Sequence, residues 1–355
     1  MGRITKLRDL MGVIKDKASE SKAALLSKPN TLSLHLAVLR ATTHSSPSTP
    51  PDDKHLAALL SLGDASRATA SALVKALMDR LHRTGDAAVA LKCLLTIHHI
   101  IKRGPFILQD QLSIFPASGG RNYLNLSDFR DGATATTWNL SAWVRWYARY
   151  LETLLSTSRV LGFFFSSPST TQEKDKEDER VSSFMTTDLI RDVDSLVVLL
   201  EEICKLPDSL YVEGYQLLNE ILVFLNGDYL SAVNEVLLRL GEFKERLSCL
   251  SFADSVELTC TLKGLEDCKE RLAVLFTLKK PSTETLWVLT GELKNRVSQV
   301  KVYREGKKLR RDNGSESARF DERVLRHSDS AQFSSGRFGL DKSSSTALRD
   351  AESTI

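Results

Sequence analysis

The sequence predicts an all-α protein. Apolar residues recur at every third or fourth position along most of the chain, as they do on the buried face of a helix. Turn signals such as Gly63-Asp64, Gly85-Asp86 and Gly227-Asp228 separate these stretches. No run of alternating β-branched residues is long enough for a sheet. The predicted helices cover residues 66–84, 86–103, 138–163, 185–205, 210–226, 228–250 and 254–277.

Residues 1–30 form a basic N-terminal segment with an amphipathic pattern. Its apolar residues gather on one helical face, and most of its lysines lie elsewhere. This pattern is typical of a helix at a membrane interface, although a helix packed on its own domain shows it too. The candidate membrane-contact residues are Ile4, Leu7, Leu10, Met11, Ile14, Lys15, Lys17, Lys22 and Lys28.

The stretch LRATTHSSPSTPPDDKHL (residues 39–56) carries the most informative chemistry. A helix bearing Arg40 and His44 ends in a Ser/Pro loop, and a second helix opens near Lys54 and His55. Cations beside a helix N-terminus form an anion site, because the exposed backbone N–H groups add positive potential. An ordinary solvated loop explains the same residues. The sequence leaves both interpretations open.

Other polar residues in apolar stretches are predicted to be structural. His98 and His99 are adjacent and point about 100° apart, so they cannot form a metal pair at i and i+4. We expect them to be core residues or to make buried hydrogen bonds. Trp138, Trp143 and Trp146 fit a packed helix. The five cysteines include no CxxC pair, and we expect reduced core thiols: Cys93, Cys204, Cys249, Cys260 and Cys268.

Several function classes are disfavoured. No GxSxG motif and no nucleophile–base set is present, so we do not expect an enzyme, and no motif indicates a cofactor or a metal ion. The net charge of +3 is too small to indicate nucleic acid by itself, and basic residues do not line successive helices. No apolar run approaches the ~18 residues that span a bilayer. The expected reduced thiols indicate the cytosol, so we expect a cytoplasmic protein.

Two segments lack the apolar content to fold. Residues 166–182 read as a charged linker between two helical halves, and residues 305–355 read as a disordered Ser/Arg-rich tail. The tail repeats the pattern Ser-x-[Arg/Gln]-Phe, which is a peptide that a partner docks, a kinase target or compositional noise. The repeated aromatic residues are Phe320, Phe333 and Phe338.

The sequence resembles the ANTH domain of monomeric clathrin assembly proteins, and most closely the short plant members of that family. The resemblance rests on the 39–56 stretch, LKCLLTIHHIIKRG (91–104), RNYLNLSDFRD (121–131) and WVRWYARYLE (143–152). It implies a right-handed helical superhelix that binds phosphatidylinositol 4,5-bisphosphate. It also implies clathrin or coat accessory proteins as partners, SNARE cargo in some members, and a peripheral place on plasma membrane coated pits and vesicles or the Golgi.

The family's headgroup motif, Lys-x9-Lys-x-[Lys/Arg]-[His/Tyr], maps onto Arg40, Lys54 and His55. The spacer here is two residues longer, and the middle lysine falls on Asp52. A carboxylate at that position repels a polyanionic headgroup, unless Asp52 instead caps its helix. We therefore expect weaker or less selective lipid binding. The long members carry clathrin motifs such as NPF or DPF in the tail, and this tail has none.

Five segments follow from the pattern and the resemblance. They are a basic N-terminal segment (1–30), an ENTH-like helical half (31–165), a linker (166–182), a second helical half of the ANTH domain (183–304) and the tail (305–355). The expected function is a phosphoinositide-binding adaptor for clathrin-mediated endocytosis. The alternative is a helical protein-binding scaffold, or SNARE-cargo adaptor, with weak or lost headgroup recognition.

Overall fold

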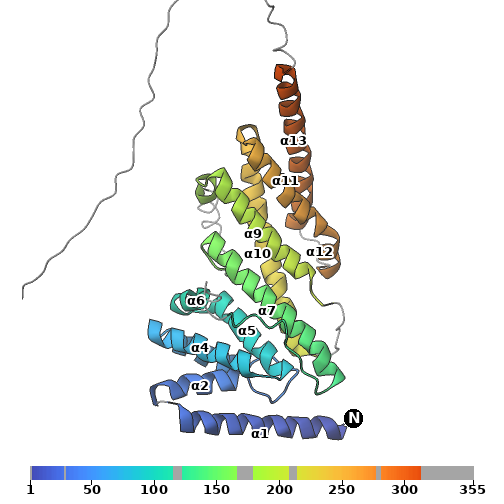
Figure 1. Cartoon of the computed structure of the whole chain (residues 1–355). Helices are drawn as coiled ribbons and strands as arrows, with labels where there is room; N and C mark the ends of the chain where they lie inside the picture. The colour runs from blue at the N-terminus through green and yellow to red at the C-terminus, as the bar shows by residue number, and fades with distance from the viewer. Residues whose placement is uncertain are drawn as a thin grey trace, which may run out of the picture. The chain divides into compact units, whose positions relative to one another are not determined.

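The computed structural model describes residues 2–27, 29–114, 122–165, 179–207, 214–276 and 281–312, and all regular structure within them is helical (Figure 1). The all-α prediction is confirmed. The α-helices are α1 (Gly2–Leu26), α2 (Pro29–Ala41), α3 (Asp53–Gly63), α4 (Arg67–Arg83), α5 (Ala87–Arg103), α6 (Phe106–Ser113), α7 (Ala135–Leu161), α9 (Thr186–Cys204), α10 (Gln216–Arg246), α11 (Phe252–Asp267), α12 (Lys269–Leu275) and α13 (Pro281–Asp312), with a 3-10 turn at Leu247–Cys249.

Contacts divide the chain into two units, Met1–Gly306 and Lys307–Ile355. Of the second unit, the structure describes only the end of α13, through Asp312. Most of the expected linker and tail, including the three tail phenylalanines, lies outside the described residues. The expected division into five segments therefore stays a prediction.

Helices that follow one another in the chain pack against one another in the first unit. α2 contacts α3 and α4, α4 contacts α5 and α6, α5 contacts α7, and α7 contacts α9. α9 then contacts α10, α11 and α12. Figure 1 shows this progression as neighbouring colours from α2 to α11. One apolar core runs through these helices, because each buries one face on the preceding helix and another on the next.

α5 lies at the centre of this core. All its residues from Ala87 to Ile101 are buried, including Lys92, His98 and His99. The expected buried role of the two histidines is confirmed. His98 Nδ1 lies 2.8 Å from the Tyr147 hydroxyl. The His99 ring packs edge-on against the Phe224 ring. A helix that is enclosed on all sides must satisfy its polar groups through other helices.

α10 corrects one sequence prediction. The expected helix boundary at Gly227-Asp228 is wrong, because α10 runs without interruption from Gln216 to Arg246. Asp228 is fully buried and serves as an acceptor for side chains of α5 and α7. Its carboxylate lies 2.7 Å from His98 Nε2, 2.6 Å from Lys102 Nζ and 2.6 Å from the Tyr150 hydroxyl. A residue type that often marks a turn is here a buried counter-ion.

The same helix overturns the expectation that no stretch is long and apolar enough to cross a membrane. By length and composition alone, Gln216–Cys249 qualifies, because an 18-residue window within it has a mean hydropathy of 1.3. However, 44% of that 18-residue window is buried inside the protein. The helix also carries the buried Arg239, which pairs with Asp192 at 3.0 Å and Glu235 at 2.6 Å. These features are typical of a core helix in a folded domain.

Two smaller predictions are also corrected. The helix expected at 254–277 is divided at Cys268 into α11 and α12. All five cysteines are free thiols, but Cys249 and Cys260 are exposed and are not core residues. Trp138 is likewise exposed, because it lies in the first turn of α7 before the helix enters the core, whereas Trp143 and Trp146 are buried.

We predict that Asp228→Ala lowers the free energy of unfolding by about 3–5 kcal/mol, because it leaves the Lys102 ammonium without a counter-ion and the buried His98 and Tyr150 without a hydrogen-bond partner. Burial alone would raise the pKa of Asp228, but His98 and Lys102 outweigh it and hold the pKa below 3.8. The stabilisation is therefore present at neutral pH and is lost as pH falls below about 4. Urea unfolding measures the change.

The matched control is Asp194→Ala, which removes an exposed carboxylate from α9 and should leave the urea midpoint unchanged. Equal midpoints for Asp228→Ala and the parent would show that the buried carboxylate contributes nothing.

Candidate anion-binding site

The loop between α2 and α3 is shaped at both ends by side-chain hydrogen bonds. α2 ends at Ala41, and the Thr42 hydroxyl donates to the Val38 carbonyl at 2.6 Å. At the other end, the Asp52 carboxylate accepts from the Lys54 backbone N–H at 2.8 Å. Asp52 therefore is the N-cap of α3, as the sequence allowed. Its charge faces the helix terminus.

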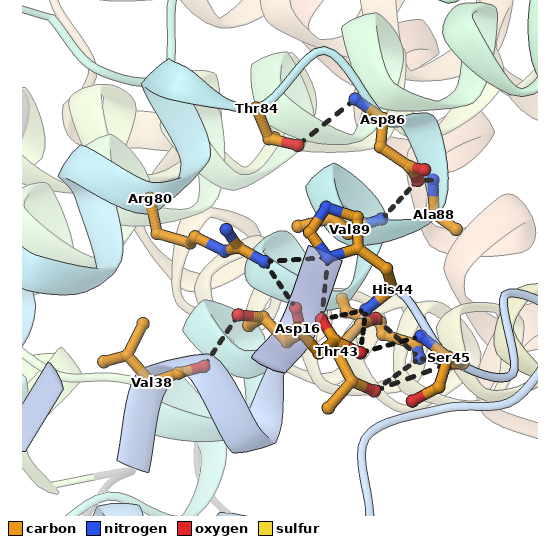
Figure 2. Close-up of polar contacts among 12 residues, drawn as sticks. Asp16, Val38, Thr43, His44, Ser45, Arg80, Thr84, Asp86, Ala88 and Val89 are labelled. Carbon is orange, nitrogen blue, oxygen red and sulfur yellow. Dashed lines mark hydrogen bonds and ion pairs between the residues drawn. The ribbon is translucent and has the colours of Figure 1, made fainter. Parts of the chain in front are cut away.

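α1 supports this loop from one side (Figure 2). The Asp16 carboxylate accepts from the backbone N–H groups of His44, at 2.9 Å, and Ser45, at 3.1 Å, and it lies 2.7 Å from His44 Nδ1. Burial would raise the pKa of Asp16, but these hydrogen bonds outweigh it and lower the pKa. A Cβ placed on Gly12 would meet the His44 carbonyl oxygen at 3.0 Å. Glycine thus permits the close approach.

α5 also supports the loop, through the side chain of Lys92. Lys92 Nζ donates to the carbonyl oxygens of Thr43, at 3.1 Å, and Ser45, at 2.9 Å. Burial lowers the pKa of Lys92 to about 8, although the charges of Asp16 and Asp86 oppose that shift. The ammonium is therefore protonated at neutral pH and holds two loop carbonyls at once.

Two more helices complete the support. Arg80 of α4 donates to the Thr42 carbonyl at 3.2 Å, and the Leu217 backbone N–H at the start of α10 donates to the Ser48 carbonyl at 2.8 Å. Ser46 is held at φ 50°, in the left-handed region that non-glycine residues rarely adopt. A conformation of this kind persists only where the surroundings fix it. The loop is therefore preorganised.

The supported loop borders a cavity of about 600 Å³. Arg40 and His55 both line it, so the structure brings together two of the three predicted headgroup residues. Lys54 is exposed in the first turn of α3 and is not among the lining residues. The Arg40 side chain is 53% exposed, and its nearest carboxylate is Glu20 at 3.5 Å. The guanidinium is accessible to a ligand.

The charge of this cavity is mixed. Asp52, Asp53 and Glu220 also line it, together with Lys92 and His99. Burial, then the charges of His98 and Arg103, lower the pKa of His99 to about 4, so this imidazole is neutral at neutral pH. Lys92, His99 and Glu220 are neighbours of the site that were not predicted from the sequence. Only Lys92 left a signal, as a lone lysine in an apolar run.

α1 leaves its apolar row uncovered. Leu7, Leu10, Met11 and Ile14 are 67%, 58%, 50% and 53% exposed, because the helix contacts the loop through Gly12 and Asp16. Lys15, Lys17 and Lys22 are exposed as well. Lys28 and the side chain of Ile4 lie outside the described residues. No cluster of metal-ligating side chains occurs in the described part of the chain.

Gly12→Ala is predicted to destabilise the protein by about 1–3 kcal/mol, because the added methyl group meets backbone atoms that cannot rotate away. Gly241→Ala in α10 is the control: nothing lies within 4 Å of its new Cβ, so it should stabilise by about 0.5–1 kcal/mol. Thermal unfolding of both variants checks the contrast. A Gly12→Ala protein as stable as the Gly241→Ala protein would contradict the close approach.

The Lys92 amine is predicted to titrate near pH 8, far below the ordinary lysine value of 10.5. Between these two values the unfolded chain holds a proton that the folded chain has released, so stability rises with pH across that window. NMR of the lysine Cε resonances measures the midpoint, and Lys92→Met assigns it. A Lys92 midpoint at the ordinary value would refute the desolvated placement.

Comparisons with known proteins agree with this architecture. A family model described as ANTH domain matches residues 33–212. Three Arabidopsis thaliana proteins, each named a putative clathrin assembly protein, are similar over most of their length. One is 54% identical over 350 residues, covering 95% of this chain and 96% of the relative. The others are 34% identical over 294 residues (80% and 84%) and 32% identical over 301 residues (82% and 99%). The chain therefore belongs to the ANTH domain family.

Proposed function

We propose that this protein is a clathrin adaptor that binds phosphoinositide membranes through the α2–α3 loop. The relatives named as clathrin assembly proteins support the adaptor role. The observation that carries the lipid-binding role is the preorganised loop, which presents Arg40 and His55 to one cavity. Four helices, α1, α4, α5 and α10, hold this loop, so the loop loses little conformational entropy when a headgroup binds.

The cations act from two neighbouring helix ends. Arg40 lies in the last turn of α2, and Lys54 and His55 lie in the first turn of α3. A headgroup phosphate at the cavity accepts from the Arg40 guanidinium and the His55 imidazole, while Lys54 attracts it from the rim. Asp52 directs a carboxylate oxygen at the backbone N–H of Lys54. This hydrogen bond reduces the repulsion between the Asp52 carboxylate and a phosphate. It also occupies the Lys54 N–H, which a phosphate would otherwise use as a donor.

α1 supplies a second membrane contact. Its exposed apolar row, flanked by Lys15 and Lys17, suits the boundary between headgroups and acyl chains. Each lysine near an anionic surface contributes about 1 kcal/mol. Because Asp16 ties α1 to His44 of the loop, a membrane contact by the apolar row would hold the loop close to the bilayer.

This function places the protein in the cytoplasm, peripherally on coated pits and vesicles of the plasma membrane. Clathrin or coat accessory proteins are the expected partners, with residues 305–355 as the arm that carries Phe320, Phe333 and Phe338. SNARE cargo and a Golgi location stay predictions from the family resemblance. No feature of the described residues requires an enzymatic activity.

Vesicle co-sedimentation with the full-length chain tests the lipid-binding role. We expect Arg40→Gln with Lys54→Gln to abolish sedimentation with vesicles containing phosphatidylinositol 4,5-bisphosphate, because each charge-assisted contact is worth about 1.5–3 kcal/mol. The control is Arg191→Gln with Lys263→Gln, which removes the same charge from exposed positions of α9 and α11. If the first double variant sediments like the parent, the lipid site lies elsewhere.

A second candidate function is a protein-binding scaffold with weak headgroup recognition, and the three carboxylates of the cavity favour it. Asp52→Asn separates the two, because asparagine caps a helix as well as aspartate but carries no charge. A headgroup site predicts tighter vesicle binding at unchanged thermal stability. Unchanged binding by Asp52→Asn, combined with weak sedimentation of the parent, would favour the scaffold.

A further inference from the structure

Three arginines gather where the loop after α6 meets α7. Arg130 donates to the Phe129 carbonyl at 2.7 Å, and Arg145 of α7 donates to the same oxygen at 2.9 Å. Two guanidinium groups therefore share one acceptor. Burial, and then the charge of Arg130, lower the pKa of Arg145. Arg149 follows one helical turn later on the same face of α7 and is exposed.

The surroundings leave this positive charge uncompensated. Among the described residues, no carboxylate lies within ion-pairing distance of Arg130, Arg145 or Arg149. Like charges held this close cost free energy unless an anion joins them. Guanidinium groups at the surface of a fold, without an internal counter-ion, are suited to an external carboxylate.

A cavity of about 380 Å³ lies beside these arginines, and Arg145 and Arg149 line it. Its two glutamates already have partners: Glu152 accepts from Asn122 at 2.8 Å, and Glu202 accepts from Lys205 at 2.9 Å. Both acids of the cavity have a hydrogen-bond partner within the protein, whereas neither Arg145 nor Arg149 has a carboxylate partner among the described residues. The arginines of this site therefore lack an anionic partner within the described part of the chain.

The rest of the cavity wall has an apolar part and a polar part. Leu124, Leu126, Ala142, Trp146 and Pro207 make up the apolar part, and Asn125, Ser127 and Lys205 the polar part. The Trp146 indole N–H is already bonded to the Glu202 carbonyl at 3.0 Å. A lipid headgroup, which is polar on all sides, would leave the apolar part uncovered. The two glutamates also oppose a multiply charged phosphate more than a single carboxylate. A short peptide with acidic and aromatic side chains satisfies both parts of the wall.

We propose that this cavity between α7 and the end of α9 binds an acidic peptide segment of a partner protein, with its carboxylates on Arg145 and Arg149 and an apolar side chain against the half-buried Pro207. It is a different surface from the α2–α3 loop, and it requires no phosphoinositide. The guanidinium pairs supply charge-assisted hydrogen bonds, and the apolar contact selects among acidic sequences.

Fluorescence anisotropy of the full-length chain with fluorescein-labelled Gly-Asp-Glu-Phe-Asp-Glu-Gly tests this proposal. The parent should bind, and a peptide with Ser in place of Phe should bind more weakly. Arg149→Gln should reduce affinity about tenfold or more, because it removes a charge-assisted contact. Arg149 is exposed and has no side-chain partner among the described residues, so this variant should fold, which circular dichroism verifies. Lys263→Gln, on the exposed surface of α11, is the charge-matched control and should bind like the parent.

Two results would overturn the proposal. The first is a parent chain that shows no binding up to about 1 mM peptide. The second is equal peptide affinity for the parent and Arg149→Gln; loss of vesicle sedimentation by the same variant would then assign the arginines to the membrane. Failure of the phosphoinositide role alone, seen with the Arg40 and Lys54 variants, leaves peptide binding intact and is thus distinguishable.

Discussion

The buried ammonium of Lys92 is the interaction on which the candidate site depends. It lies in a helix that is enclosed on all sides, and its two carbonyl partners belong to a loop that has no regular structure of its own. A cation in that position is costly unless it is fully bonded. The loop therefore has to keep the shape that satisfies Lys92, and the placement of Arg40 and His55 follows from that shape.

Asp16 applies a related constraint from the other side. Carboxylate and ammonium contact the same short stretch of backbone, Thr43–Ser45, one through N–H groups and the other through carbonyl oxygens. Backbone groups held from both sides cannot turn to satisfy one partner without losing the other. This explains why a segment rich in serine and proline is ordered, and why α1 can be joined to it while leaving its apolar row exposed.

Much of the fold could be predicted from the sequence because helical periodicity is a local property. The helices expected at 66–84 and 86–103 appear as α4 and α5 with ends that differ by one residue or less. Prediction failed where a distant partner decides the role of a residue. Asp228 looked like a turn residue, yet its partners His98 and Lys102 precede it by 130 and 126 residues.

The residues of the candidate site also include some that could be predicted from local sequence and some that could not. Arg40 and His55 could be found because they flank one loop, and their type and spacing are visible in the sequence. Glu220 and His99 could not, since they reach the cavity from α10 and α5. The charge of the site is therefore less positive than the loop alone suggests. Local sequence indicated where an anion could bind, whereas the packing of other helices sets how strongly.

The bonds from α10 to the first half of the domain also have a consequence for synthesis. Lys102 leaves the ribosome 126 residues before its counter-ion Asp228. At about 5–20 residues per second, this separation lasts roughly 6–25 s. During that interval His98 and Lys102 have no carboxylate, and the Ser48 carbonyl awaits Leu217. The α2–α3 loop of a nascent chain therefore reaches its final form only after the start of α10 has been made.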